Sequence, residues 1–174
     1  MDDKDVSQQY SRGATFEDLI KLCQHLNELG ARYVVIGGFA IIHYGYHRGT
    51  NDIDLLIDDS FQNIEKIKKA LLFLPDQAIR EVDAEEIVRY QVVRVADEIV
   101  VDLMTKACQV TYQEAEPHIE FDDIKGVKIP FLKPEILIQT KDTYRPRDKA
   151  DKAYLEELID RSKKFREKKP WWRW

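Results

Sequence analysis

Two aspartates separated by one residue, Asp52 and Asp54, are the side chains whose type and spacing point most directly to chemistry. The apolar run over residues 53–57 predicts a strand, in which side chains at positions i and i+2 point to the same side. The two carboxylates then lie next to each other and repel, which lowers stability and raises pKa values. A divalent cation removes that repulsion, and Mg²⁺ binds one or two carboxylates together with phosphate oxygens. The alternative is two solvated aspartates at the end of an edge strand.

A glycine pair, Gly37-Gly38, is separated from Asp52 by thirteen residues and follows the apolar run Tyr33–Ile36. That run predicts a buried strand, and residues 39–44 predict a short helix after it. Backbone N–H groups at the start of a helix can bind an anion, and glycine permits close approach. A glycine pair by itself usually marks only a tight turn. Next to the aspartates, it predicts a phosphate site beside a metal site.

A third carboxylate, Asp102, lies inside the apolar run 99–104. An ionisable side chain in an apolar strand is costly unless it has a partner, so Asp102 is a candidate for a functional carboxylate. The alternative is a position at a bulge or a sheet edge. Asp97 is a weaker candidate, because it lies in a predicted turn where aspartate commonly hydrogen-bonds the backbone.

The stretch from Ile36 to Leu55 resembles the signature of the polymerase-β-type nucleotidyltransferase superfamily. That signature is an apolar residue, Gly, Gly or Ser, a spacer, and then Asp, apolar, Asp or Glu, apolar. Arg48 and Thr50, just before Asp52, resemble the form found in small bacterial antibiotic nucleotidyltransferases and abortive-infection toxin-type nucleotidyltransferases. We therefore expect an α+β fold in which helices flank a mixed, nucleotidyltransferase-like sheet.

The resemblance implies an enzyme that transfers a nucleoside monophosphate from an NTP such as ATP to an acceptor hydroxyl and releases pyrophosphate. It implies a two-metal Mg²⁺ site in which Asp52 and Asp54 bridge the ions, and in which Asp102 binds on the acceptor side and takes the hydroxyl proton. The residues that it places at the nucleotide and its phosphates are Gly37, Gly38, Arg48, Thr50, Lys141 and Arg145.

Lys141 and Arg145 belong to a basic C-terminal pattern that continues through Arg147 and Asp148 to Asp151. The pattern resembles the closing helices of the same small nucleotidyltransferases, whose basic residues face the phosphates. Lys141 and Arg145 share a helix face if one helix spans both. The alternative is a solvated face with ion pairs between successive turns.

Periodicity and turn residues predict one domain over 1–174, with a core at about 15–140 and basic helices and a tail at about 141–174. Helices are expected from Thr15 to Gly30 and over 61–73, 111–115, 134–143 and 147–166. Strands are expected over 87–95 and 99–104, with a hairpin whose tip is Lys125-Gly126. Residues 76–86 are expected to be irregular.

The composition, with 44% hydrophobic and 34% charged residues, excludes a wholly disordered chain. The sequence has no apolar run of about 20 residues, so we expect no membrane contact through a spanning helix. The acidic start Met1–Asp5 does not resemble a signal peptide. Two cysteines without CxxC spacing predict free thiols, and together these features favour the cytoplasm.

The acceptor stays open among a small molecule, an RNA end and a protein side chain. The net charge is −5, yet residues 141–174 hold twelve Lys/Arg against seven Asp/Glu. The acidic body favours a cationic small molecule, whereas the Lys/Arg/Trp tail over 163–174 favours RNA or protein contact. The tryptophans could also fold back onto the body. The rival classes are a non-catalytic nucleotide- or partner-binding module of the same fold, including a toxin–antitoxin component, and a scaffold without a nucleotide site.

Overall fold

The structure, a computed structural model, describes residues 10–167. The first nine residues and the end of the tryptophan-rich tail lie outside the described residues, and so do the predicted RNA and partner contacts of that tail end. Within the described part, no helix combines the length and the apolar character needed to cross a membrane.

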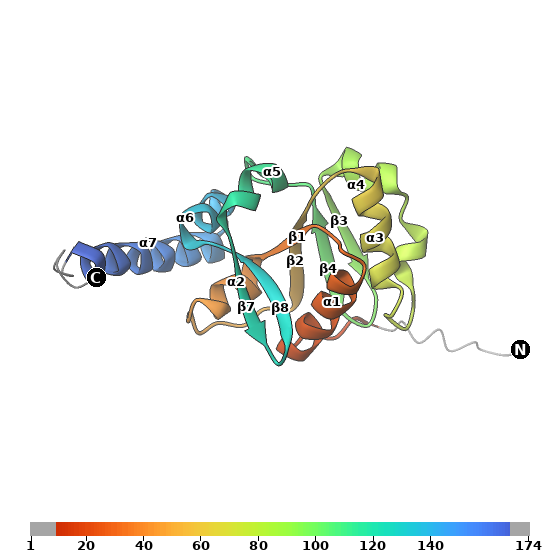
Figure 1. Cartoon of the computed structure of the whole chain (residues 1–174), viewed down its shortest axis with the longest axis horizontal. Coiled ribbons are helices and arrows are strands. Elements are labelled where there is room, and N and C mark those ends of the chain that lie inside the picture. Colours follow the sequence, from red (N-terminus) through yellow and green to blue (C-terminus); the bar gives the residue numbers. More distant parts are fainter. Residues whose placement is uncertain (1–9, 168–174) are drawn as a thin grey trace, which may run out of the picture.

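A six-stranded mixed sheet forms the centre of the molecule (Figure 1). The strand order is β3 (Val92–Ala96), β4 (Val100–Met104), β2 (Asp52–Ile57), β1 (Tyr33–Ile36), β8 (Val127–Leu132) and β7 (Ile119–Ile124). The pairs β2–β4 and β1–β8 are parallel, and the other three pairs are antiparallel. This arrangement confirms the predicted mixed fold class.

Helix α1 (Phe16–Glu28) begins where the sequence predicts. The Thr15 hydroxyl accepts a hydrogen bond from the Asp18 backbone N–H, and the Asp18 carboxylate accepts one from the Thr15 backbone N–H. Helix α3 (Phe61–Leu71) packs against α1. Their apolar faces and the alternate residues of β2, Ile53 and Leu55, form one buried core. Because Ile53 and Leu55 point into that core, Asp52 and Asp54 must point to the other face of the sheet.

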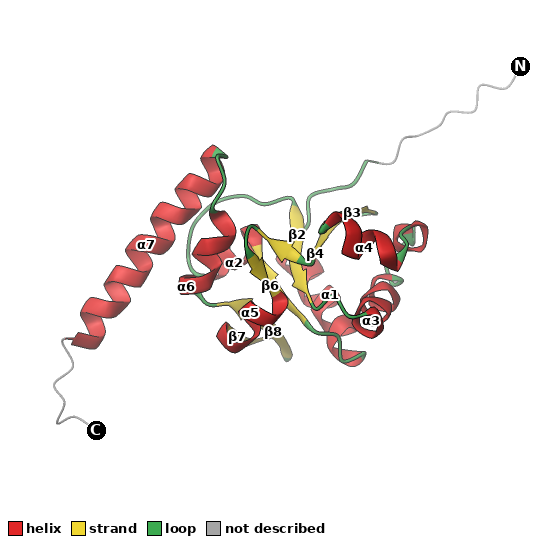
Figure 2. Cartoon of the chain, turned by 90° about the horizontal axis from the view of Figure 1, so that it is seen from above, coloured by secondary structure: helices red, strands yellow, loops and turns green. Residues whose placement is uncertain are grey.

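The remaining described elements lie around this sheet. They are α2 (Gly37–His43), η1 (Ala78–Glu81), α4 (Ala84–Tyr90), the β5–β6 ladder (Lys106–Ala107 and Val110–Thr111), α5 (Tyr112–Ala115), η2 (Glu116–His118), α6 (Pro134–Leu137), η3 (Ile138–Lys141) and α7 (Pro146–Glu167). Helix α7 packs against α6 and η3, and its C-terminal half extends away from the body (Figure 2).

The predicted strand over 87–95 is wrong in its first half, because Ala84–Tyr90 forms helix α4. Asp83 and Glu86 make reciprocal side-chain-to-backbone hydrogen bonds that start this helix, and Gln91 ends it at a φ of 61°. The strand begins only at Val92. Residues 76–86 are not wholly irregular either, since they include η1. The predicted helix over 134–143 ends at Lys141 and changes to 3₁₀ geometry at Ile138.

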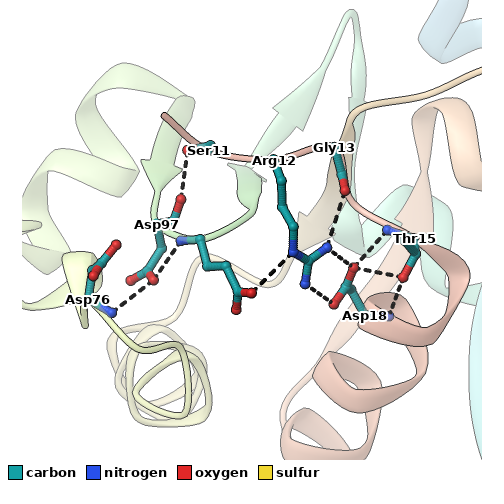
Figure 3. Close-up of polar contacts among 8 residues, drawn as sticks. Ser11, Arg12, Gly13, Thr15, Asp18, Asp76 and Asp97 are labelled. Atoms are coloured by element: carbon teal, nitrogen blue, oxygen red, sulfur yellow. Dashed lines mark hydrogen bonds and ion pairs between the residues drawn. The ribbon is translucent and has the colours of Figure 1, made fainter. Parts of the chain in front are cut away.

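Asp97 is held in the turn between β3 and β4 (Figure 3). Its buried carboxylate accepts hydrogen bonds from the backbone N–H groups of Asp76, Ala78 and Glu98, at 2.8–3.0 Å. Ser11 donates to its backbone carbonyl. These contacts explain why a carboxylate is buried here, and they place Asp97 in the turn chemistry that the sequence predicts.

Candidate functional site

A cavity of about 580 Å³ opens on the polar face of the sheet. Strands β2, β3 and β4 form one side of it, and the segment from Thr140 to Asp148 forms another. All nine residues predicted for the site line this one cavity: Gly37, Gly38, Arg48, Thr50, Asp52, Asp54, Asp102, Lys141 and Arg145. The fold therefore brings together residues that are up to about a hundred positions apart in sequence.

The strand register places the carboxylates in a row. Asp54 on β2 is the register partner of Asp102 on the parallel strand β4, so both side chains project from the same face. On the far side of β4, the antiparallel register pairs Asp102 with Arg94 of β3. On the far side of β2, Asp54 pairs with Ile36, the last residue before the glycine pair. One row across four strands therefore joins Arg94, Asp102, Asp54 and the start of α2.

Arg94 bridges two of the three carboxylates. Its guanidinium donates to Asp102 through Nε (2.9 Å) and Nη2 (2.8 Å), and Nη2 also donates to Asp52 Oδ2 (3.0 Å). The hydrogen bonds to Asp102 hold the pKa of Arg94 well above its ordinary value. The sequence pattern does not mark Arg94 as a site residue. The one indication in the sequence is that Arg94 is the only charged residue in the apolar run 92–96. Its pairing with Asp102 depends on the register of the β3–β4 hairpin.

Asp54 is the carboxylate in the least favourable position for a charge. Burial, followed by repulsion from Asp52 and Asp102, raises the pKa of Asp54 to about 7. The positive charge of Lys141 and a hydrogen bond from the Gly38 backbone N–H lower it again, but less strongly. Asp54 thus gains and loses a proton near neutral pH, and anything cationic that approaches it favours the ionised form.

The two glycines are required because side chains approach them closely. A Cβ on Gly37, whose φ is +64°, would lie 1.9 Å from Asp54 Oδ2. A Cβ on Gly38 would lie 2.3 Å from Thr50 Oγ1. The structure puts Gly37 and Gly38 inside α2, so the predicted boundary between strand and helix lies two residues too late. The Gly38 N–H, predicted to bind phosphate, donates to Asp54 in this structure.

Arg48 and Lys141 share one buried partner, Asp151 of α7, which is 0% exposed. Lys141 Nζ lies 2.9 Å from Asp151 Oδ2 and 3.4 Å from Asp148 Oδ1. Arg48 Nη2 donates to Asp151 Oδ2 at 2.8 Å, and Arg48 Nε lies 2.8 Å from Oδ1 without hydrogen-bond alignment. Asp151 therefore fixes both bases at the cavity wall, and it ties α7 to the site. It belonged to the basic pattern of the sequence but was not selected as a site residue.

Arg145 and Arg147 also line the cavity and are exposed. Arg145 follows the end of η3 and precedes α7, so it does not share a helix with Lys141 as the sequence analysis considered. Both arginines still line the cavity, where they add positive charge. Lys106 and Cys108, which the sequence analysis did not assign to the site, line it as well.

The donor set fits a hard divalent cation. Asp52, Asp54 and Asp102 supply carboxylate oxygens on adjacent strands, and their mutual repulsion is the electrostatic condition that a cation relieves. In this structure the three aspartates are not arranged as a group that could hold a metal ion. The described residues contain no other group of three or more His, Cys, Asp or Glu side chains that could do so. Arg94 lies on two of the three carboxylates.

The fold of this chain has counterparts in solved nucleotidyltransferase structures. A putative nucleotidyltransferase from Thermotoga maritima has a TM-score of 0.51 and 18% identity, over 87% of this chain and 89% of that one. An antigenic nucleotidyltransferase-like protein from Paracoccidioides brasiliensis has a TM-score of 0.52 and 17% identity, over 85% and 78%. The lincomycin-bound lincosamide antibiotic adenylyltransferase LnuA has 0.50 and 14%, over 83% and 98%. The chain therefore has the nucleotidyltransferase fold.

Residues 22–161 match the family described as "Nucleotidyl transferase AbiEii toxin, Type IV TA system". The match covers most of the chain, and the protein belongs to this family. No curated protein sequence matches the chain. The family membership confirms the resemblance seen in Ile36–Leu55.

We predict that Gly37→Ala removes nucleotide binding, because the new Cβ would displace the Asp54 carboxylate. Gly126→Ala is the matched control, since Gly126 also has a positive φ (+80°) but has open space around it. Both substitutions share the backbone strain of about 1 kcal/mol. NTP titration by calorimetry should show lost binding only in Gly37→Ala. Equal binding by the two variants would contradict the close approach to Asp54.

The raised pKa of Asp54 predicts a pH-dependent stability. Between pH 4 and about 7 the folded chain holds a proton on Asp54 that the unfolded chain has lost, so rising pH destabilises the fold. Asp54→Asn should therefore gain stability over the wild type as pH rises from 5 to 8, by at most about 2.7 kcal/mol. Urea unfolding in EDTA measures this gap, with exposed Asp59→Asn as the control. A stability difference between Asp54→Asn and the wild type that stays constant with pH would show that the pKa of Asp54 is not raised.

Proposed function

We propose that this protein is a divalent-cation-dependent nucleotidyltransferase that moves a nucleoside monophosphate from an NTP to an acceptor hydroxyl. The observation that carries the proposal is the row of carboxylates on β2 and β4, which lines the same cavity as the basic residues Arg48, Lys141, Arg145 and Arg147. Carboxylate oxygens and cations in one cavity suit a triphosphate bound with a metal ion. Family membership supports the same chemistry.

In the proposed reaction the acceptor oxygen attacks the α-phosphorus in line, the bond to the β-phosphate oxygen breaks, and pyrophosphate leaves. Asp52, Asp54 and Asp102 would hold Mg²⁺, which neutralises charge on the entering and leaving oxygens. Arg145 and Arg147 would contact the triphosphate, while Asp151 keeps Arg48 and Lys141 at the wall. Most of the rate would come from positioning and charge neutralisation.

Asp102 is the proposed acceptor of the hydroxyl proton. Both of its oxygens accept a hydrogen bond from Arg94 in this structure, and each keeps a second lone pair that could take the proton. The acceptor itself stays open among a small molecule, an RNA end and a protein side chain. LnuA is a lincosamide antibiotic adenylyltransferase with lincomycin bound, and this likeness supports a small-molecule acceptor. The family description supports a role as the toxin of a toxin–antitoxin pair.

A nucleotide-binding module without turnover is the second candidate. The observation that favours it is that the cations nearest to the carboxylates are already paired within the chain: Arg94 with Asp52 and Asp102, and Lys141 with Asp148 and Asp151. Such a module would bind NTP and release no pyrophosphate.

Label transfer from α-³²P NTPs with Mg²⁺ tests the proposal. The acceptors offered are total RNA, lincosamides and aminoglycosides, and the protein itself. We expect the wild type to label one class, Asp54→Asn to lose at least about 100-fold in rate, and Asp59→Asn to be unaffected. Circular dichroism checks that both variants fold. Full transfer by Asp54→Asn would reject the metal assignment, and NTP binding without transfer to any acceptor would favour the non-catalytic module.

A further inference from the structure

Arg94 binds two of the three carboxylates that would hold the proposed metal ion. Its planar guanidinium takes Oδ1 and Oδ2 of Asp102 and Oδ2 of Asp52 at 2.8–3.0 Å. Bidentate guanidinium–carboxylate contacts of this kind are among the strongest hydrogen bonds in proteins. Among the described residues, the Arg94 side chain hydrogen-bonds to these two aspartates only. Arg94 therefore satisfies the same oxygens that a divalent cation needs.

The position of Arg94 lets it leave without disturbing the core. It lies on β3, the edge strand of the sheet, and its side chain is 61% exposed. Val93 and Val95, its neighbours, face the opposite side of the strand, and the guanidinium hydrogen-bonds to carboxylates that line the cavity. A change of side-chain rotamer frees Asp52 and Asp102, and such changes in exposed residues are fast.

We infer that Arg94 is a counter-ion built into the chain, which holds Asp52 and Asp102 together before the metal arrives and which the metal must displace. Arg94 thereby sets the affinity of the site for divalent cations. This inference rests on the proposed function, because it takes the carboxylate row as the metal site. Neither the family description nor the signature in Ile36–Leu55 includes Arg94.

Competition for the same oxygens has a measurable consequence. If only a fraction of the molecules has Arg94 released, the apparent dissociation constant for the metal is the intrinsic one divided by that fraction. Removing the guanidinium removes this factor, so the affinity must rise. If Arg94 instead held the carboxylates in the positions that the metal needs, removing the guanidinium would lower the affinity for the metal.

Mn²⁺ is the probe, titrated into the full chain without nucleotide at fixed pH, with free Mn²⁺ followed by electron paramagnetic resonance. We expect Arg94→Gln to bind Mn²⁺ about tenfold more tightly than the wild type. Arg94→Lys keeps the charge but loses the bidentate fork, so it should lie between the two. Arg89→Gln is the matched control: it removes one positive charge from the exposed face of the adjacent helix α4, and it should match the wild type.

Thermal unfolding with and without Mn²⁺ shows whether each variant is folded. If Arg94→Gln folds poorly, the Mn²⁺ affinity of Arg94→Lys is compared with that of the wild type instead. Equal or weaker binding by both Arg94 variants would overturn the inference while leaving the proposed function in place. An increase of the same size in Arg89→Gln would also overturn it, because a general charge effect would then explain the result. Absence of Mn²⁺ binding in every protein would overturn the metal site and, with it, the proposed function.

Discussion

Repulsion among three carboxylates on two adjacent strands is the interaction on which the rest of this site depends. Asp52 and Asp54 must face the cavity because Ile53 and Leu55 face the core, and the register of β4 adds Asp102 to the same face. The chain limits the repulsion with its own groups: Arg94 pairs with two of the aspartates, the Gly38 N–H contacts the third, and Lys141 lies close enough to lower its pKa. By fixing β2 and β4, the hydrophobic core holds the three carboxylates close together, and a bound cation can relieve their repulsion.

The C-terminal helices complete the site through one buried group. Asp151 is fully buried on α7, yet its two partners, Arg48 and Lys141, come from the loop before β2 and from η3. A buried carboxylate is tolerated only with such partners. The packing of α7 against the body and the positions of Arg48 and Lys141 therefore depend on the same ion pairs. These two basic residues and the carboxylate row line the same cavity. Groups of both charges in one cavity are what the proposed binding of a nucleoside triphosphate with its metal calls for.

The sequence predicts the parts of this arrangement that are local. The Gly37-Gly38 pair, the Asp52 and Asp54 pair, the strand of Asp102 and the α1 cap all follow from spacing and residue type, and the family resemblance agrees with them. The pairs that depend on register or on docking are not local: Arg94 meets Asp102 across a hairpin, and Asp151 meets Arg48 from 103 positions away. Helix α4 is missed because its side-chain cap at Asp83 outweighs an apolar pattern that resembles a strand.

The central claim is that the cavity binds an NTP together with a divalent cation held by the carboxylate row. The most direct measurement is the thermal stability of the wild type with each NTP, with and without Mg²⁺, beside the double variant Asp52→Asn/Asp54→Asn. The account predicts a Mg²⁺-dependent gain of about 2.7 kcal/mol at a nucleotide concentration 100 times the dissociation constant, absent in the double variant. A gain of the same size in the double variant, or one that needs no Mg²⁺, would contradict it.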